Sequence, residues 1–146
     1  MSGEVALVDA NVLVYAHYQQ SEHHAASKAL LTSAEAGQVA LCVTSQVLAE
    51  FYSVITNPRR VSPPFEPDEA VAALDHVLAL PGISILPLPS DVPKRWIELA
   101  RDRALRGKRV FDLQLIATMQ ASTIRRIYTY NLGDFSGFVG IEAIRP

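Results

Sequence analysis

The sequence predicts a three-layer α/β/α sandwich whose central, mainly parallel sheet has four or five strands. Short apolar runs alternate with amphipathic segments of ten or more residues, as in proteins where helices connect parallel strands. Pro and Gly residues punctuate the ends of these segments. The chain has 146 residues, of which 49% are hydrophobic and 19% charged, so we expect residues 1–146 to form one globular domain.

The strands are expected where apolar residues run without a helical period. Short runs of this kind, flanked by turn-forming residues, suit strands that are buried on both faces of a parallel sheet. The sequence contains four of them, at residues 5–8, 39–43, 83–86 and 127–129. Residues 141–144 would add a fifth strand.

Helices in the first half of the chain have recognisable ends. One can begin at Asn11, and a second is expected over residues 25–36, ending at Gly37 because Gly commonly follows the last helical turn. Thr44 can cap a third helix that reaches Ile55, in which apolar residues recur at helical spacing. Three helices are therefore expected before residue 57.

The second half of the chain opens with a loop. Residues 57–67 hold four prolines and two adjacent arginines, so neither a helix nor a central strand can continue through them. Amphipathic helices are then expected over residues 68–78 and 90–106, the latter ending at Gly107. A final helix is expected over residues 112–121.

Charge and cysteine content limit the classes of function. The net charge of -2 and the pI near 6.1 give no global basic field, so any binding of a polyanion must be local. Cys42 is the single cysteine, which excludes an internal disulfide and suits a reducing compartment. No apolar run approaches the roughly 20 residues that cross a bilayer, so we expect a cytoplasmic protein without membrane contact.

Five polar side chains stand out by their position: Asp9, Glu50, Asp112, Asn131 and Asp134. Each has an ordinary structural explanation. Asp9 can cap a helix, Glu50 can be a boundary residue that reaches water, and Asp112 can stabilise the helix dipole. The last two lie in a stretch whose composition also suits a simple turn.

The competing interpretation is that these side chains meet. Asp9 closes the first strand, and chemistry in open parallel sheets collects outside the carboxyl ends of the strands. Asp112 shares a helix face with Leu115 and Ile116, which directs it inward. Converging carboxylates would repel one another unless a cation compensates, and oxygen ligands without His or Cys select Mg²⁺ or Mn²⁺. Asp9 therefore looks like a metal ligand.

Four segments resemble one known family, the PIN-domain ribonucleases, and within it the VapC toxins of bacterial toxin-antitoxin pairs. The segments are VDANVLVYA around Asp9, SQVLAEFYSVIT around Glu50, GKRVFDLQLIAT around Asp112, and TYNLGDF near the end. They occur in the family's order and span nearly the whole chain. No single segment is specific, but the ordered set is.

The resemblance implies an endoribonuclease that depends on Mg²⁺ or Mn²⁺, forms a homodimer and is blocked by a cognate antitoxin. The family's acidic positions carry over to Asp9, Glu50 and Asp112, with Asp9 and Asp112 as the direct metal ligands. Many relatives have Asp where this chain has Asn131, while Asp134 lies three residues further on. Which of these two fills the fourth position, and whether one metal ion binds or two, stays open.

A basic cluster precedes Asp112 and could attract RNA to an acidic site. It contains Arg101, Arg103, Arg106, Lys108 and Arg109, and the proline-rich loop adds Arg59 and Arg60. We expect Arg106 and Lys108 to contact the substrate backbone. A solvated helix face with ordinary loop charges explains the same pattern equally well.

Two rival functions come from other classes. One is a PIN-fold module that binds RNA or protein with little or no catalysis, which the neutral Asn131 keeps open. The other is a phospho-acceptor signalling domain in which Asp9 would be phosphorylated. The chain lacks an obvious acidic pair before its first acceptor strand, which argues against the second rival.

Overall fold

The computed structural model describes residues 3–146 and contains a five-stranded sheet in the order β3-β2-β1-β4-β5. All four neighbouring pairs are parallel. The strands are β1 (Ala6–Val8), β2 (Leu41–Val43), β3 (Ile83–Ile85), β4 (Arg126–Tyr128) and β5 (Glu142–Ile144). The predicted parallel sheet is confirmed, with the fifth strand present at its edge.

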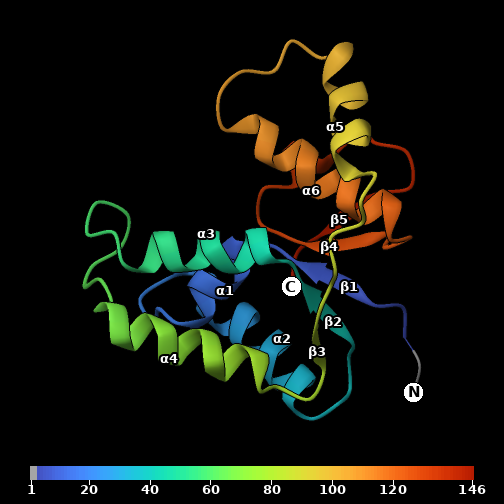
Figure 1. Cartoon of the computed structure of the whole chain (residues 1–146). Coiled ribbons are helices and arrows are strands. Elements are labelled where there is room, and N and C mark those ends of the chain that lie inside the picture. The colour runs from blue at the N-terminus through green and yellow to red at the C-terminus, as the bar shows by residue number, and fades with distance from the viewer. Residues whose placement is uncertain (1–2) are drawn as a thin grey trace.

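Helices lie on both faces of this sheet, which confirms the three-layer α/β/α prediction. They are α1 (Ala10–Ala16), α2 (His24–Glu35), α3 (Ser45–Ile55), α4 (Pro67–Leu78), α5 (Val92–Arg101) and α6 (Arg109–Ala121), followed by the short 3-10 helix η1 (Leu132–Phe135). Figure 1 shows α1 to α4 grouped on one side and α5 with α6 on the other. This division follows from right-handed crossovers, because the chain moves outward from β1 to β3 and then returns across the sheet to β4.

The central strand β1 fixes the geometry of the site. All three of its residues are buried between the helical layers, and it pairs with β2 on one side and β4 on the other. Val8 lies opposite Tyr128, so Asp9 and Thr129 leave the sheet side by side. Two polar residues that are 120 positions apart in the sequence therefore become neighbours at the carboxyl edge.

Two predicted boundaries are wrong in a way that affects the site. The helix expected over residues 90–106 ends at Arg101, and α6 begins at Arg109 instead of at Asp112. Between them the chain is irregular, and Gly107 has a φ of 61°, a left-handed conformation that Gly adopts without steric cost. This turn lets α6 pack back against α5 and leaves Asp112 in the first turn of α6.

The other expected ends agree more closely. Thr44 caps α3 as predicted, because its hydroxyl accepts a hydrogen bond from the backbone N–H of Val47 at 3.1 Å. The proline-rich segment is irregular until Pro67, where α4 starts. Within residues 3–146, no helix has the length and apolar character needed to span a membrane.

Candidate active site

A cavity of about 740 Å³ lies at the carboxyl edge of the sheet. Its lining includes every acidic or amide side chain that the sequence pattern singled out: Asp9, Glu50, Asp112, Asn131 and Asp134. These side chains come from the end of β1, from α3, from α6 and from the segment around η1. Residues scattered along most of the chain therefore share one cavity.

Asp9 is the most deeply placed of these carboxylates, with only 6% of its surface exposed. Its Oδ1 accepts a hydrogen bond from the backbone N–H of Ala10 at 2.8 Å, which makes Asp9 the N-cap of α1. Its Oδ2 accepts hydrogen bonds from the Thr129 hydroxyl at 2.8 Å and from Nδ2 of Asn11 at 3.3 Å. Three donors thus fix the orientation of this carboxylate, and the capping role coexists with a place on the cavity wall.

Thr129 and Asn11 are part of the site although the sequence pattern did not single them out. Nδ2 of Asn11 also donates to the Thr129 hydroxyl oxygen at 3.2 Å, and Oδ1 of Asn11 accepts from the backbone N–H of Tyr130 at 3.2 Å. The backbone N–H of Asn131 donates to the Thr129 hydroxyl oxygen at 3.0 Å. These bonds tie the end of β4 to the start of α1. The sequence signal for Thr129 is that a polar residue directly follows β4, as Asp9 follows β1. This signal becomes informative only once β4 is known to lie beside β1.

Glu50 and Asp112 reach the cavity from helices on opposite faces of the sheet. In α3, Val47 and Phe51 are buried, and Glu50 lies between them on an exposed edge of the helix that faces the cavity. Asp112 is half-buried in the first turn of α6, beside the buried Leu113. Asp112 therefore has the inward direction expected from its helical spacing, whereas Glu50 is more accessible to solvent.

The carboxylates raise one another's affinity for protons. Burial raises the pKa of Asp9, and the hydrogen bonds from Thr129 and Ala10 oppose this shift only in part. Burial, followed by the charge of Asp9, raises the pKa of Glu50. Burial, followed by the charges of the other three carboxylates, raises the pKa of Asp112 to about 6. The cavity is thus an electrostatic environment that favours a cation.

Three basic side chains partly offset this negative charge, and all of them line the cavity: Arg60, Lys108 and Arg109. The first two lower the pKa of Glu50, which places their positive charges within reach of its carboxylate. Nη2 of Arg109 lies 3.9 Å from Oδ1 of Asp134, and both side chains are about half exposed. The rim therefore carries positive charge directly beside the acidic floor.

The basic cluster expected before Asp112 is divided by the fold. Lys108 and Arg109 line the cavity, whereas Arg101, Arg103 and Arg106 do not. Arg101 and Arg103 make contacts within their own helical region instead, to a carboxylate and a backbone carbonyl respectively. Of the two residues expected to contact a substrate backbone, Lys108 therefore lies at the cavity, and Arg106 is exposed outside its lining.

The donor set suits a hydrated divalent cation. Within residues 3–146, no three His, Cys, Asp or Glu side chains are arranged to enclose a metal ion by themselves. Mg²⁺ is commonly held by only one or two carboxylates and keeps several waters, and Mn²⁺ accepts the same oxygen ligands. Asp9 and Asp112, which interact electrostatically across the cavity, can supply those two carboxylates.

Sequence comparison places the chain among known proteins. Residues 6–136 match the PIN domain family model. Ribonuclease VapC24 of Mycobacterium tuberculosis is 28% identical over 131 residues, which cover 90% of this chain and 89% of that protein. Ribonuclease VapC43 of the same species is 35% identical over 113 residues, which cover 75% of each chain.

Solved structures share the fold at lower sequence identity. The crystal structure of Mycobacterium tuberculosis VapC20, described as a Sarcin-Ricin loop cleaving toxin, has a TM-score of 0.69 and 22% identity, covering 98% of this chain and all of that one. VapBC2 from Rickettsia felis, bound to a DNA fragment from its promoter, has a TM-score of 0.67 and 17% identity, covering 97% and 98%. On the family match and the relatives' identity, this chain belongs to the PIN domain family, among the VapC ribonucleases.

Proposed function

We propose that this protein is a Mg²⁺- or Mn²⁺-dependent endoribonuclease that acts as the toxin of a toxin-antitoxin pair. The observation that carries the proposal is the single cavity lined by Asp9, Glu50, Asp112 and Asp134 at the carboxyl edge of the sheet. The ribonuclease names of the relatives support the choice of RNA as the substrate class. Basic side chains at the rim, including Lys108, would attract the RNA backbone to an otherwise acidic surface.

The cavity residues would have separate roles in phosphodiester hydrolysis. A divalent cation supplies Lewis acidity, which neutralises charge on the scissile phosphate and makes a water easier to deprotonate. Asp9 and Asp112 would hold this cation, and the bonds from Thr129 would keep Asp9 in the required orientation. Glu50 and Asp134 would orient the attacking water in line with the phosphorus or would hold a second ion. The family resemblance implies products with a 5′-phosphate and a 3′-hydroxyl.

The proposed partners follow from the relatives. Structures of VapBC complexes from Rickettsia felis and Haemophilus influenzae support a cognate antitoxin as the protein partner. The resemblance to VapC toxins implies a homodimer. The free, buried thiol of Cys42 suits a reducing compartment, so we place the activity in the cytoplasm.

Metal dependence is the decisive test of this proposal. Purified protein, separated from any antitoxin, should cut structured RNAs in Mg²⁺ or Mn²⁺ and should leave them intact in excess EDTA, because the carboxylates need a cation to approach a phosphate. Gel analysis of end-labelled RNA would report both the cuts and the chemistry of the new ends. Restoring activity by adding Mg²⁺ to the EDTA sample is the control. Cleavage that persists in EDTA, or no cleavage with either metal, would contradict the proposal.

A second candidate is a binding module that retains the fold without catalysis. The observation that favours it is the neutral, exposed Asn131 on the cavity wall, at a position where the family resemblance implies an acid. Such a protein would bind RNA in the presence of metal but make no cuts. The same assay therefore separates the two functions.

Lys108 provides a test of how the RNA backbone is bound. If its ammonium group neutralises one phosphate, Lys108→Gln should reduce the slope of log K against log salt concentration by about 0.7–0.9, the value for one released counterion. Arg106→Gln is the matched variant, because it removes a neighbouring exposed charge outside the cavity lining. Filter binding of an uncleavable RNA between low and physiological salt would give both slopes. An unchanged slope in Lys108→Gln would reject a contact between Lys108 and an RNA phosphate. A smaller slope in Arg106→Gln would show that Arg106 also neutralises a phosphate.

A further inference from the structure

The cavity changes chemical character with distance from the sheet. Asp9 lies at the start of α1, whereas Val14 and Tyr15 lie one to two turns further along the same helix. On α3, the lining continues from Glu50 to Val54, one turn further on. At a rise of about 1.5 Å per residue, Tyr15 is about 9 Å beyond Asp9 along the helix axis. The lining thus passes from carboxylates to apolar and uncharged side chains.

We call this second part the distal end of the cavity and define it by Val14, Tyr15, Tyr18, Ser53, Val54 and Val61. The proline-rich loop bounds it on one side. The Tyr18 hydroxyl donates a hydrogen bond to the carbonyl oxygen of Pro63 at 3.0 Å, and Nε2 of Gln20 donates to the carbonyl oxygen of Ser62 at 2.9 Å. These bonds attach the loop to the chain that follows α1, so the distal end has a defined wall.

The cavity is larger than the proposed metal site requires. A cation with six waters would occupy roughly 180 Å³, at about 30 Å³ for each water. The volume of about 740 Å³ lies instead in the range of roughly 300–1,000 Å³ that is typical of pockets for organic ligands. The distal end therefore has room for a further group, and its apolar and uncharged lining suits an uncharged one.

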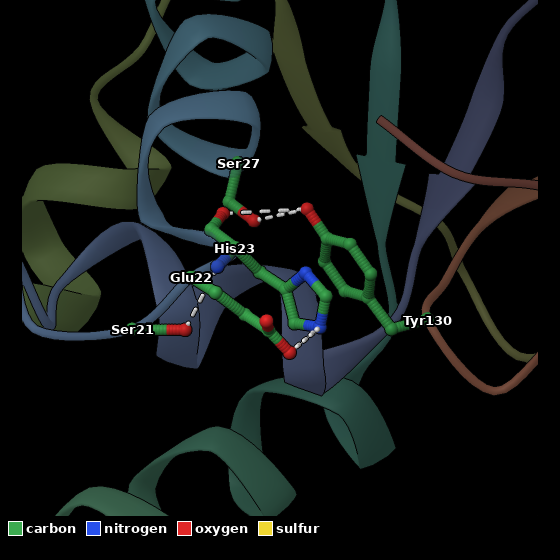
Figure 2. Close-up of polar contacts among 5 residues, drawn as sticks. All are labelled: Ser21, Glu22, His23, Ser27 and Tyr130. Carbon is green, nitrogen blue, oxygen red and sulfur yellow. Dashed lines mark hydrogen bonds and ion pairs between the residues drawn. The ribbon is translucent and has the colours of Figure 1, made fainter.

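The distal end has two aromatic residues, Tyr15 and Tyr18. Tyr18 is buried, whereas Tyr15 is partly exposed, and other rings hold Tyr15 in place. The rings of His23 and Tyr130 stack with centroids 4.1 Å apart and an interplanar angle of 22°. Figure 2 shows the polar contacts that hold this pair. The Tyr130 hydroxyl lies 2.8 Å from Oγ of Ser27, and Oε1 of Glu22 lies 3.5 Å from Nε2 of His23. The Tyr15 ring contacts both stacked rings, with centroids at 5.1 and 5.3 Å and at steep angles. Among the aromatic pairs of residues 3–146, Tyr15 has no parallel stacking partner.

We propose that the distal end binds the nucleobase of a nucleotide adjacent to the scissile phosphate, with the base stacked on Tyr15. This inference rests on the proposed ribonuclease function and specifies where the substrate lies. Every base has a face that can stack on an aromatic ring, and such stacking is a common way of holding single-stranded RNA. Ser53 and the adjacent loop offer uncharged polar groups to the edge of the base. The phosphate would then lie toward Asp9.

The binding test compares ligands with and without a base. In Mg²⁺, at least one of the four nucleoside 5′-monophosphates should bind about fivefold to hundredfold more tightly than ribose 5-phosphate, as expected for one stacked base. Chemical-shift titration of the labelled protein would give the affinities. Tyr15→Leu should remove the preference. Tyr52→Leu is the matched control, because Tyr52 is a half-buried tyrosine of α3 outside the cavity lining.

A second pair of variants tests the proposal without changing Tyr15, in case Tyr15→Leu does not fold. Ser53 is exposed on α3, so Ser53→Phe should fill the distal end without disturbing the core, whereas Ser53→Ala should not. Loss of the base preference in Ser53→Phe and its retention in Ser53→Ala would support the proposal. Equal affinity for ribose 5-phosphate and all four nucleotides, or an unchanged preference in both Tyr15→Leu and Ser53→Phe, would overturn it.

Cleavage of modified RNA separates this inference from the proposed function. The native protein should cleave an RNA with an abasic nucleotide next to the cut site less efficiently than the unmodified RNA. In Ser53→Phe the cleavage efficiencies of these two RNAs should be closer together. Normal cleavage with no effect of the abasic nucleotide on either side of the cut would overturn base binding and leave the ribonuclease proposal intact. Base-selective nucleotide binding without any RNA cleavage would support the distal site and reject the ribonuclease proposal.

Discussion

Replacing Asp9 with Asn should abolish RNA cleavage while leaving the protein folded. Asp9 is the most buried carboxylate of the cavity, and three hydrogen bonds orient it. Removal of groups that merely orient metal ligands typically costs 10-fold to 100-fold in affinity or activity, so loss of a direct ligand should exceed about 100-fold. The initial rate of cleavage of an end-labelled RNA at saturating Mg²⁺ measures the effect.

The same substitution should change stability little, because two effects oppose each other. Asn retains an oxygen that can accept the N-cap hydrogen bond from Ala10, and Asn is as good a capping residue as Asp. Burial raises the pKa of Asp9, which means that its ionised form is unfavourable in the folded protein, so the neutral Asn relieves this cost. Asn also loses the oxygen Oδ2 that accepts hydrogen bonds from Thr129 and Asn11, and this loss opposes the gain. Thermal melting should therefore show a Tm close to that of the native protein. Asp75→Asn, on the exposed side of α4, is the matched control and should keep full activity. Substantial cleavage by Asp9→Asn would contradict the assignment of Asp9 as a metal ligand.

The predictable part of this site came from local patterns. Asp9 directly follows an apolar strand, and Asp112 shares a helix face with buried residues, so each direction could be inferred within a few positions of the chain. Parallel strands then bring their carboxyl ends to one edge, which explains why separate segments line one cavity. The periodicity of the sequence was sufficient for this level of description.

The unpredictable part depends on contacts between distant segments. Thr129 becomes a partner of Asp9 only because β4 pairs with β1, and sequence periodicity does not specify the order of strands. The support of Tyr15 by His23 and Tyr130 likewise joins α1, the start of α2 and the end of β4. The aromatic wall of the distal end therefore had no local signature.

Helix ends between charged residues were also difficult to locate. The segment after Leu99 is rich in Arg, which is compatible with a continuing helix, and Gly107 was the only strong signal for an end. The structure ends α5 at Arg101 instead. Arg106 consequently lies in the connecting turn, away from the cavity lining that Lys108 joins.

Replacing Asp112 with Asn should stabilise the metal-free protein by an amount that grows between about pH 4 and pH 6 and then stays constant. Burial and the three neighbouring carboxylates raise the pKa of Asp112 from its ordinary value of 3.8 to about 6. The folded protein therefore binds this proton more tightly than the unfolded chain does. Its free energy of unfolding should fall as the pH rises from about 4 to about 6 and should stay lower at higher pH. Asn has no charge to bury, so the free energy of unfolding of the variant should not show this fall with pH.

The expected gain is about 1–2 kcal/mol at pH 7.5 after allowance for solvent screening of a half-buried group, and close to zero at pH 4. Urea unfolding in EDTA at the two pH values measures it, with Asp75→Asn as the control for removal of an exposed carboxylate. Adding Mg²⁺ at pH 7.5 should stabilise the native protein more than Asp112→Asn, because a bound cation compensates the ionised carboxylates. A gain of equal size at pH 4 and pH 7.5 would show that charge repulsion is not its cause. Equal stabilisation of both proteins by Mg²⁺ would exclude Asp112 as a ligand, even if the pH dependence held.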